Sequence, residues 1–244
     1  MSGESLSVPG APRRGMVLAA GLGVRLRPIT DRMPKPMVPV AGRSLVDRAL
    51  DRFAEAGVDT CVVNLHHKAD MLRHHLEART GGPALVFSDE TEVLLETGGG
   101  VRKALPLLGR EPFFVANADV LWVNGAEPAM RRLAAAWDGE RMDSLLLLMA
   151  CAGACGYDGA GDFFMDDAGL LRRRGEHDSA PFLFAGVQII HPRLFEDSPE
   201  GKFSLNLLFD RAIARGRLHG LAHDGAWYHI GTPEGLALAE RRLS

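Results

Sequence analysis

The sequence predicts an α/β fold: a Rossmann-like, mostly parallel sheet flanked by helices. Short apolar runs of the kind found in strands buried on both faces alternate with segments whose apolar residues recur at helical spacing. This alternation continues from residue 16 to residue 117, with glycine and proline at the junctions. Strand, helix and strand in this order pair in parallel through right-handed crossovers.

The first predicted strand, Met16–Ala20, leads into a turn that contains Gly21 and Gly23. Both glycines allow a positive φ angle and close approach of the backbone, so that successive backbone N–H groups can converge on an anion. Arg25 and Arg27 add positive charge beside this turn, and so does Lys35, whose flanking prolines are expected to hold its backbone extended. The turn is therefore predicted to bind a polyphosphate.

Two glycines after a strand also occur in ordinary turns, and the glycines alone do not decide between the two interpretations. The turn is not a dinucleotide fingerprint, because Leu26 stands where the third glycine would be. It is not a P-loop either, because no Gly-Lys-Ser/Thr sequence follows it. The added arginine and the Pro-Lys-Pro segment favour the phosphate site.

The elements that follow are predicted in order from caps and periodicity. Ser44 is the expected N-cap of the first long helix, with Asp47 three residues later. Up to the last strand of this half, the predicted elements are helix 44–56, strand 60–65, helix 68–78, strand 84–88, helix 98–107 and strand 112–116.

In the second half, residues 157–174 are predicted to form a hairpin whose turn is Asp166–Gly169. Residues 182–190 form a strand that Ala185-Gly186 interrupts, and a final helix follows Pro233. No internal repeat or long linker divides the chain, so residues 16–244 are predicted to be one domain. Residues 1–15 are polar and are expected to be a disordered leader.

Composition narrows the class of protein. Charged residues make up 24% of the chain and the formal net charge is −3, which argues against a nucleic-acid surface. No apolar run approaches the ~18 residues of a membrane span. The three cysteines, Cys61, Cys151 and Cys155, lack the spacing of a zinc site and indicate free thiols in a reducing, cytoplasmic compartment. The histidines at 66, 67, 74 and 75 are interpreted as surface residues rather than a metal site.

Two further motifs carry candidate site residues. Glu96-Thr97-Gly98 opens a predicted helix with three consecutive glycines, which offers bare N–H groups at a positive helix terminus; a plain helix cap is the alternative. Asp119 follows an apolar strand and is therefore expected at the carboxyl edge of the sheet, where open α/β folds bind ligands. We interpret it as a Mg²⁺ ligand rather than a cap of the next segment.

The segment Leu18-Ala-Ala-Gly-x-Gly-x-Arg-x-x-Pro-x-Thr30, followed by Pro34-Lys35-Pro36, resembles the signature of sugar-1-phosphate nucleotidyltransferases at every position. Asn117-Ala118-Asp119 is similar to the Asn-Gly-Asp of that family. Leu95-Glu-Thr-Gly-Gly-Gly looks most like the branch of uridylyltransferases that act on N-acetylmuramate 1-phosphate, an activity of peptidoglycan recycling.

The resemblance implies a smaller sugar-side lobe in the second half, and a role for each matching residue. Arg25, Lys35 and Asp119 would be catalytic, with Asp119 and His229 at the metal. The implied nucleotide-binding residues are Leu18, Ala19, Ala20, Gly21, Gly23, Glu90, Thr97, Gly98 and Asn117, of which Glu90, Thr97 and Gly98 would face the base; those implied for the second substrate are Glu96, Gly156 and Gly186.

His229 departs from the family pattern, which has Trp-x-Asp-x-Gly-Thr with that aspartate as second metal ligand. Imidazole suits Mn²⁺ better than Mg²⁺. Three options follow: His229 binds a softer metal, it hydrogen-bonds a metal-bound water or a phosphate, or Asp224 supplies the carboxylate.

The implied reaction joins a nucleoside triphosphate, UTP by resemblance, to a sugar 1-phosphate and releases pyrophosphate, with Mg²⁺ or Mn²⁺ as cofactor. Guanylyl, thymidylyl or phospho-alcohol cytidylyl transfer, and a regulatory protein without turnover, are the alternatives. The expected partners are small-molecule substrates, with no nucleic acid and no membrane, and the chain is expected to be a monomer or a homodimer.

Overall fold

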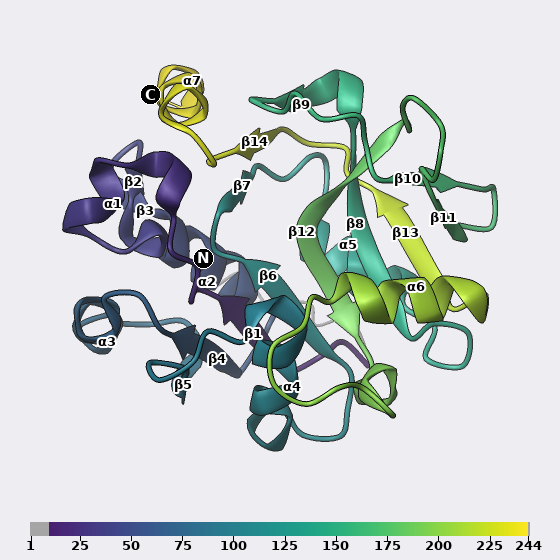
Figure 1. The fold of residues 1–244 in the computed structure, drawn as a ribbon, viewed down its shortest axis with the longest axis horizontal. Helices are drawn as coiled ribbons and strands as arrows, with labels where there is room; N and C mark the ends of the chain where they lie inside the picture. The colour runs from purple at the N-terminus through teal and green to yellow at the C-terminus, as the bar shows by residue number, and fades with distance from the viewer. Residues whose placement is uncertain (1–9, 244) are drawn as a thin grey trace, which may run out of the picture.

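The centre of the molecule is a mixed sheet, seen in a computed structural model that describes residues 10–243. Nine strands of these residues form it, in the order β11-β10-β12-β6-β1-β4-β5, with β8 beside β12 and β13 beside β8 (Figure 1). They are β1 (Arg14–Leu18), β4 (Thr60–Leu65), β5 (Ala84–Asp89), β6 (Phe113–Asn117), β8 (Ser144–Ala150), β10 (Phe163–Met165), β11 (Leu171–Arg173), β12 (Phe182–Ile190) and β13 (Leu218–Ala222).

The predicted parallel sheet is confirmed for the first half of the chain. β1 pairs in parallel with β4 on one side and with β6 on the other, so that Met16 lies between Val62 and Val115. β5 extends this parallel region beyond β4. β12 then runs antiparallel to both β6 and β8 and joins the second half of the chain to the same sheet.

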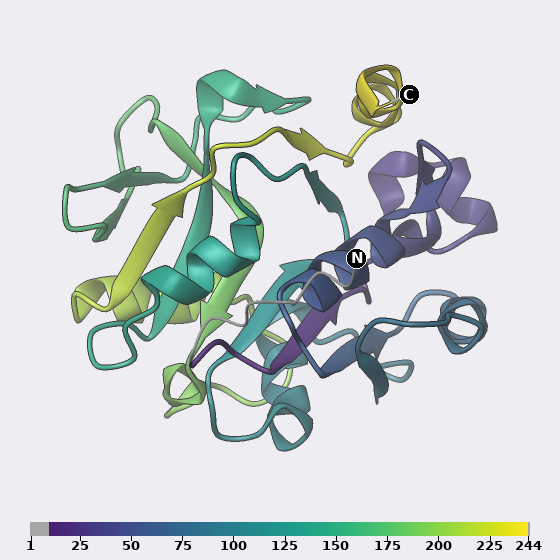
Figure 2. The same ribbon diagram turned by 180° about the vertical axis from the view of Figure 1, so that it is seen from behind.

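Helices cover both faces of the sheet because each carries one apolar stripe. Two lie on the face seen in Figure 1, namely α4 (Glu96–Leu108) and α6 (Asn206–Ala214). The opposite face, seen in Figure 2, is covered by α2 (Leu45–Glu55), α3 (Ala69–Glu77) and α5 (Ala129–Ala136).

The start of α2 confirms the predicted cap, since the Ser44 side chain accepts a hydrogen bond from the Asp47 amide. The helix buries Phe53 fully, 6.3 Å from the ring of Phe114, and burying such a side chain contributes about 1.5–3 kcal/mol. Gly15 makes this packing possible, because a Cβ there would lie 2.5 Å from the Phe53 ring.

A third apolar cluster lies beside the sheet and packs against residues 21–40, which we call the glycine segment. It joins Leu26 and Val38 to Tyr228 and Ile230, with α7 (Pro233–Leu243) packed on top. The surrounding elements are the short helix α1 (Ile29–Arg32), the pair β2 (Pro39–Val40) and β3 (Arg43–Ser44), and the sheet of β7 (Val120–Trp122), β14 (Trp227–His229) and β9 (Ala154–Cys155).

The interruption predicted in the strand at 182–190 is confirmed. The register between β12 and β8 shifts between Phe184 and Gln188, and Gly186 has a φ of +79°. A Cβ at Gly186 would lie 2.9 Å from the Val120 side chain. The glycine is therefore required by its backbone conformation and by close packing. The predicted hairpin is also present, shortened to β10 and β11.

The chain departs from the predicted boundaries at its start. β1 spans Arg14–Leu18, two residues earlier than predicted, so Arg14 and Gly15 belong to the sheet and not to a leader. Arg13 also pairs with Asp59 at 2.7 Å. Residues 1–9 of the predicted leader lie outside the described residues.

The histidines interpreted as surface residues are mostly half-buried. His66 Nδ1 lies 2.7 Å from the Glu90 carbonyl, and His75 Nε2 lies 2.9 Å from an Asp47 oxygen. His67 is also half-buried, and the prediction of an exposed side chain holds for His74. None of the helices formed by residues 10–243 has the length and apolarity needed to cross a membrane.

His219 makes the stability of this fold pH-dependent. It is 2% exposed on β13 and neither ring nitrogen has a hydrogen-bond partner among the described residues. Burial lowers its pKa below the usual 6.5, and the charge of Arg141 lowers the pKa further. The unfolded chain therefore takes up a proton at His219 more readily than the folded protein does. The free energy of unfolding consequently falls as the pH decreases below 6.5.

We expect His219→Phe to lose less stability than the wild type between pH 7.5 and pH 5.5, because the substitution removes the proton that only the unfolded chain takes up. The measurement is urea unfolding followed at both pH values. Parallel changes in the two proteins would show that His219 does not contribute.

Candidate active site

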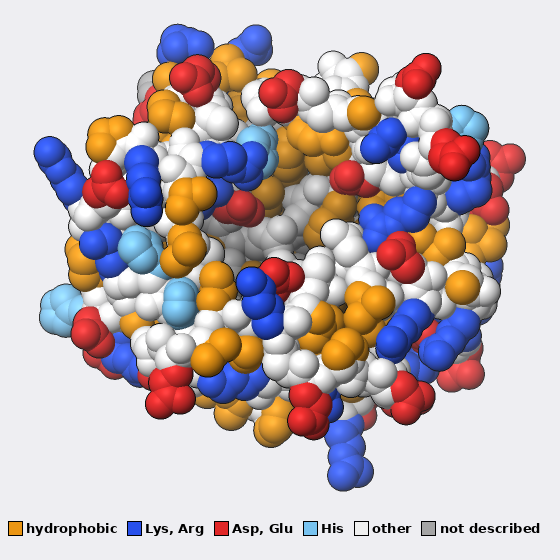
Figure 3. All heavy atoms as spheres, in the orientation of Figure 1, with side chains coloured by type: hydrophobic (Ala, Val, Ile, Leu, Met, Phe, Trp, Pro, Cys, Tyr) orange, Lys and Arg blue, Asp and Glu red, His pale blue; other side chains and the backbone are white. Residues whose placement is uncertain are grey.

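A cleft of about 550 Å³ opens where the parallel strands β1, β4 and β6 end at their carboxyl sides. Figure 3 shows this face hollowed near its centre, with basic and acidic side chains around the hollow. The structure brings most of the predicted site residues to its walls: Leu18, Ala19, Ala20, Gly21, Gly23, Arg25, Lys35, Glu96, Thr97, Asn117 and Asp119.

The glycine turn is held by contacts to its own segment. Gly23 has a φ of +63°, and its carbonyl accepts hydrogen bonds from the Leu26 amide and the Thr30 hydroxyl, each at 2.9 Å. A Cβ at Gly23 would lie 2.8 Å from Thr30 Cγ2 and 3.0 Å from Lys35 Cβ. Only glycine fits this position, for reasons of both conformation and space.

Gly21 does not use the positive φ that glycine allows, because its φ does not lie in the left-handed region. A Cβ there would meet no atom within 4 Å. Its backbone is exposed to the cleft. The missing side chain at Gly21 therefore leaves room for a ligand. No contact among the described residues requires glycine at this position.

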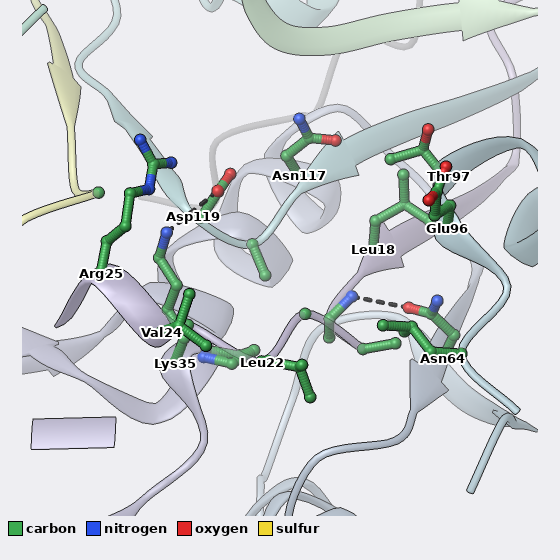
Figure 4. A pocket seen from close by; sticks show the side chains of 18 of the residues that line it. Leu18, Leu22, Val24, Arg25, Lys35, Asn64, Glu96, Thr97, Asn117 and Asp119 are labelled. Atoms are coloured by element: carbon green, nitrogen blue, oxygen red, sulfur yellow. Dashed lines mark hydrogen bonds and ion pairs between the residues drawn. The ribbon is translucent and has the colours of Figure 1, made fainter. Parts of the chain in front are cut away.

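Lys35 and Asp119, which lie 84 residues apart in sequence, form an ion pair of 3.1 Å in the cleft. The lysine side chain is only 9% exposed, whereas the aspartate is 38% exposed. Figure 4 shows Lys35 reaching from the glycine segment toward Asp119. The positive charge of a buried lysine is thus balanced by one carboxylate.

The backbone of Lys35 is not extended, which corrects the prediction from its flanking prolines. Pro34 is extended, but Lys35 begins a short 3₁₀ helix that ends at Met37. The Met37 amide donates to the Pro34 carbonyl and the Val38 amide to the Lys35 carbonyl. These hydrogen bonds outweigh the local preference of a residue that precedes proline.

Arg25 lies on the 3₁₀ helix Val24–Leu26 at the edge of the cleft, with its side chain beside Asp119 (Figure 4). It forms no hydrogen bond or ion pair with any other residue from 10 to 243, and it is exposed. A free guanidinium at this position can bind an anion that enters the cleft.

The opposite wall begins at the start of α4, where Glu96 and Thr97 face the cleft. The expectation of free N–H groups at Gly98 and Gly99 is wrong, because both amides donate to the Phe203 carbonyl, at 2.9 and 3.1 Å. A Cβ at Gly98 would lie 2.4 Å from the Phe203 ring. These glycines admit the segment 201–205 and not a ligand.

Glu90 lies outside the cleft lining and is 1% exposed. Its carboxylate accepts hydrogen bonds from Asn64 Nδ2 at 2.8 Å and from the Leu95 amide at 3.2 Å. Sequence reasoning missed Asn64, which lines the cleft and accepts a hydrogen bond from the Ala19 amide. The available signal was a polar residue inside the apolar run from Cys61 to Leu65.

The two glycines assigned to the second substrate are also outside the lining. Gly186 packs against Val120 and Asn117. Gly156 has a φ of +74°, and a Cβ there would lie 3.3 Å from the His229 carbonyl. Their conformation and packing account for both glycines, and a contact with a sugar remains a prediction.

His229 lies beside Asp119, because β14 pairs with β7 so that His229 is opposite Val120. Its ring stacks on Trp227 and forms no hydrogen bond with the described residues. Burial lowers the pKa of the imidazole, whereas the charge of Asp119 raises it.

Asp224 does not lie near this position. It pairs with Arg132 at 2.7 Å, at the end of β14 opposite to His229. The option that Asp224 replaces a metal carboxylate is therefore wrong. Across residues 10–243, no group of three or more histidine, cysteine, aspartate or glutamate side chains is placed to hold a metal ion.

The sheet and the cleft together define an α/β protein with a charged ligand site at the carboxyl ends of its strands. Residues 14–146 match the family described as Nucleotidyl transferase. The chain belongs to this family of enzymes, which confirms the resemblance seen in its motifs.

Two relatives support the same assignment over nearly the whole chain. The N-acetylmuramate alpha-1-phosphate uridylyltransferase of Caulobacter vibrioides is 46% identical over 237 residues, which cover 96% of this chain and 98% of the relative. The protein of that name from Neisseria meningitidis serogroup B is 32% identical over 221 residues, covering 90% and 93%.

Solved structures show the same fold. UDP-glucose pyrophosphorylase complexed with UDP-glucose superposes with a TM-score of 0.78 at 18% identity, covering 95% of this chain and 98% of that one. HddC from Yersinia pseudotuberculosis complexed with GMP-PN gives 0.75 at 22% identity, covering 95% and 100%.

Gly23→Ala and Gly21→Ala should separate the two roles of glycine in this turn. Gly23→Ala should lower the free energy of unfolding by about 1–3 kcal/mol, because it strains a left-handed residue and clashes with Thr30. Gly21→Ala should leave stability unchanged, since its Cβ meets no atom. Urea unfolding measures both, and equal losses would contradict this account.

Proposed function

We propose that this chain transfers a uridylyl group from UTP to N-acetylmuramate 1-phosphate and releases pyrophosphate. The observation that carries the proposal is the Lys35–Asp119 pair in a cleft that also holds a glycine turn and the free Arg25. The choice of base and sugar rests on the two relatives named as uridylyltransferases, which align over nearly the whole chain.

The reaction needs no protein nucleophile. An oxygen of the sugar phosphate attacks the α-phosphorus of UTP in line, and the bond from that phosphorus to the bridging oxygen of pyrophosphate breaks. A phosphate monoester with a second pKa of ~6 is already anionic at neutral pH. Catalysis then consists of positioning the two phosphates and neutralising their charge.

Each cleft residue takes a role that fits its position. Arg25 binds the β- and γ-phosphates, because its guanidinium is free at the open edge of the cleft. Lys35 lies deeper and bridges the sugar phosphate and the α-phosphoryl group. The exposed backbone at Gly21 allows a phosphate to approach closely.

Asp119 and His229 would hold the divalent ion. One oxygen of Asp119 has no partner among the described residues, and the imidazole beside it makes no hydrogen bond. Mg²⁺ fits Asp119, with His229 hydrogen-bonding a water; Mn²⁺ also accepts the imidazole directly. When bound, the ion supplies positive charge beside the transferring phosphoryl group.

We also propose that the chain from Arg14 onward acts as one nucleotidyltransferase domain, as monomer or homodimer, in the cytoplasm and in peptidoglycan recycling. The continuous sheet that spans both halves of the chain supports a single functional unit. The three free cysteines are consistent with a reducing compartment.

A substrate panel tests the proposed activity directly. UTP, dTTP, GTP and CTP are combined with the 1-phosphates of N-acetylmuramate, N-acetylglucosamine, glucose and mannose, and pyrophosphate release is measured with the mass of the product. We expect the highest kcat/KM for UTP with N-acetylmuramate 1-phosphate. A preference for GTP with mannose 1-phosphate would favour the guanylyl alternative, and no turnover would favour a regulatory protein.

Lys35→Ala and Asp119→Ala should each lower kcat by a hundredfold or more at saturating substrates, because a charge aimed at the transition state contributes ~3 kcal/mol. Arg27→Ala is the matched control, since Arg27 is an exposed cation of the same segment that pairs with Asp31. Wild-type turnover in either cleft variant would remove that residue from the mechanism.

Removal of divalent ions by EDTA should abolish turnover, and Mn²⁺ should restore it at least as well as Mg²⁺.

His229→Asp should shift the preference toward Mg²⁺, because carboxylate is the better ligand for that ion. Mn²⁺ binding with UTP present, followed by electron paramagnetic resonance, gives a readout independent of turnover. The control is His74→Asp, on the exposed side of α3. An unchanged Mn²⁺ spectrum would place His229 outside the metal site.

A further inference from the structure

A chain of three hydrogen bonds, two of them buried and the third partly buried, crosses the sheet beneath the cleft. The Ala19 amide donates to Asn64 Oδ1 at 2.7 Å, Asn64 Nδ2 donates to Glu90 Oε1 at 2.8 Å, and the Leu95 amide donates to Glu90 Oε2 at 3.2 Å. Asn64 is 2% exposed and Glu90 is 1% exposed. Figure 4 shows the first of these hydrogen bonds.

The two ends of this chain are the two walls of the cleft. Ala19 is the first residue after β1 and leads into the glycine turn. Leu95 directly precedes Glu96 and Thr97, which form the facing wall at the start of α4. Asn64 is the next-to-last residue of β4 and Glu90 directly follows β5, so the hydrogen bonds link the carboxyl ends of neighbouring strands.

Close packing of α4 against Asn64 and Glu90 explains why residue 100 is glycine. A Cβ at Gly100 would lie 2.9 Å from Glu90 Oε1 and 3.1 Å from Asn64 Nδ2. The helix thus comes close enough to seal the pair from solvent. Among residues 10–243, Glu90 forms no ion pair, so its two N–H donors are what offset the cost of burying it.

We propose that Asn64 and Glu90 are positioning residues that set the distance and orientation between the two walls of the nucleotide cleft. This inference rests on the proposed function, because it assigns the pair to the same site. Glu90 acts through Leu95 and Asn64 acts through Ala19, and the Glu90 carboxylate does not read the base itself. The structure thus assigns Glu90 a different role from the base contact implied by family resemblance.

The donor and acceptor pattern supplies a sharp test by exchanging the two side-chain types. Asn64→Asp places two carboxylates face to face, so the middle hydrogen bond is lost. Glu90→Gln leaves only two acceptor oxygens, one on Asn64 and one on the new glutamine, for the three hydrogen bonds. One N–H donor is therefore always without an acceptor. The double variant Asn64→Asp/Glu90→Gln restores all three hydrogen bonds, with the middle one reversed in direction.

The measurement is kcat and KM for UTP in the wild type, both single variants and the double variant. Each single variant should lower kcat/KM by about tenfold or more, chiefly through KM, because a buried polar group without a partner costs about 1–3 kcal/mol. The double variant should return to within about threefold of the wild type, since its pattern is complete. Hydrogen exchange of the Ala19 and Leu95 amides should be faster in the single variants and normal in the double.

Ser144→Ala is the matched control for loss of stability alone. The buried Ser144 hydroxyl on β8 lies 2.9 Å from the Ile189 carbonyl and 3.1 Å from Gln188 Oε1 on β12, and these residues do not line the cleft. It should lower Tm while KM for UTP stays unchanged. If a single variant does not fold, the double variant still decides the question, because it should fold and bind UTP.

Three results would overturn the inference. Wild-type KM and amide exchange in both single variants would show that the hydrogen bonds do not position the walls. A double variant no better than the worse single variant would show that the exchange does not restore them. A change of triphosphate preference that persists in the double variant would show that Glu90 contacts the base. A wild-type protein with no turnover would contradict the proposed function instead.

Discussion

The site depends on one constraint, the parallel pairing of β1 between β4 and β6. Because parallel strands end at the same edge of a sheet, the glycine turn after β1 and Asp119 after β6 come together although they are far apart in sequence. The Lys35–Asp119 ion pair then closes the gap between the two segments. A register shift of one residue in β1 would reverse the direction of each side chain and separate these groups.

The glycines of this protein serve three different physical purposes. Gly23 is needed for its left-handed backbone and for the space taken by Thr30. Gly98 and Gly99 admit the segment around Phe203, whose carbonyl binds their amides. Gly21 is unconstrained by the protein and opens the backbone to the cleft. A ligand explanation is therefore required for Gly21, whereas packing is sufficient for Gly98 and Gly99 of α4.

Charge is distributed across the cleft so that one cation is balanced and one is free. Lys35 is buried and paired, which holds its ammonium group in position before any substrate binds. Arg25 is exposed and unpaired among the described residues, so it is available to an incoming anion. His229 adds an imidazole whose pKa is lowered by burial, which disfavours a further positive charge in the cleft. This division suits a reaction between two polyanions.

From sequence alone, the alternation of strands and helices, the cap at Ser44 and the positions of Lys35 and Asp119 were predictable, because periodicity, capping and strand ends are local patterns. The Asn64–Glu90 pair and the bonding of the Gly98 amide to Phe203 join residues 26 and 105 positions apart, and no local pattern encodes them. The same applies to the neighbourhood of His229 and Asp119, which the register of β14 against β7 creates. Tertiary packing decided which glycines, amides and carboxylates remain free for a ligand, since only packing determines which polar groups the protein itself satisfies.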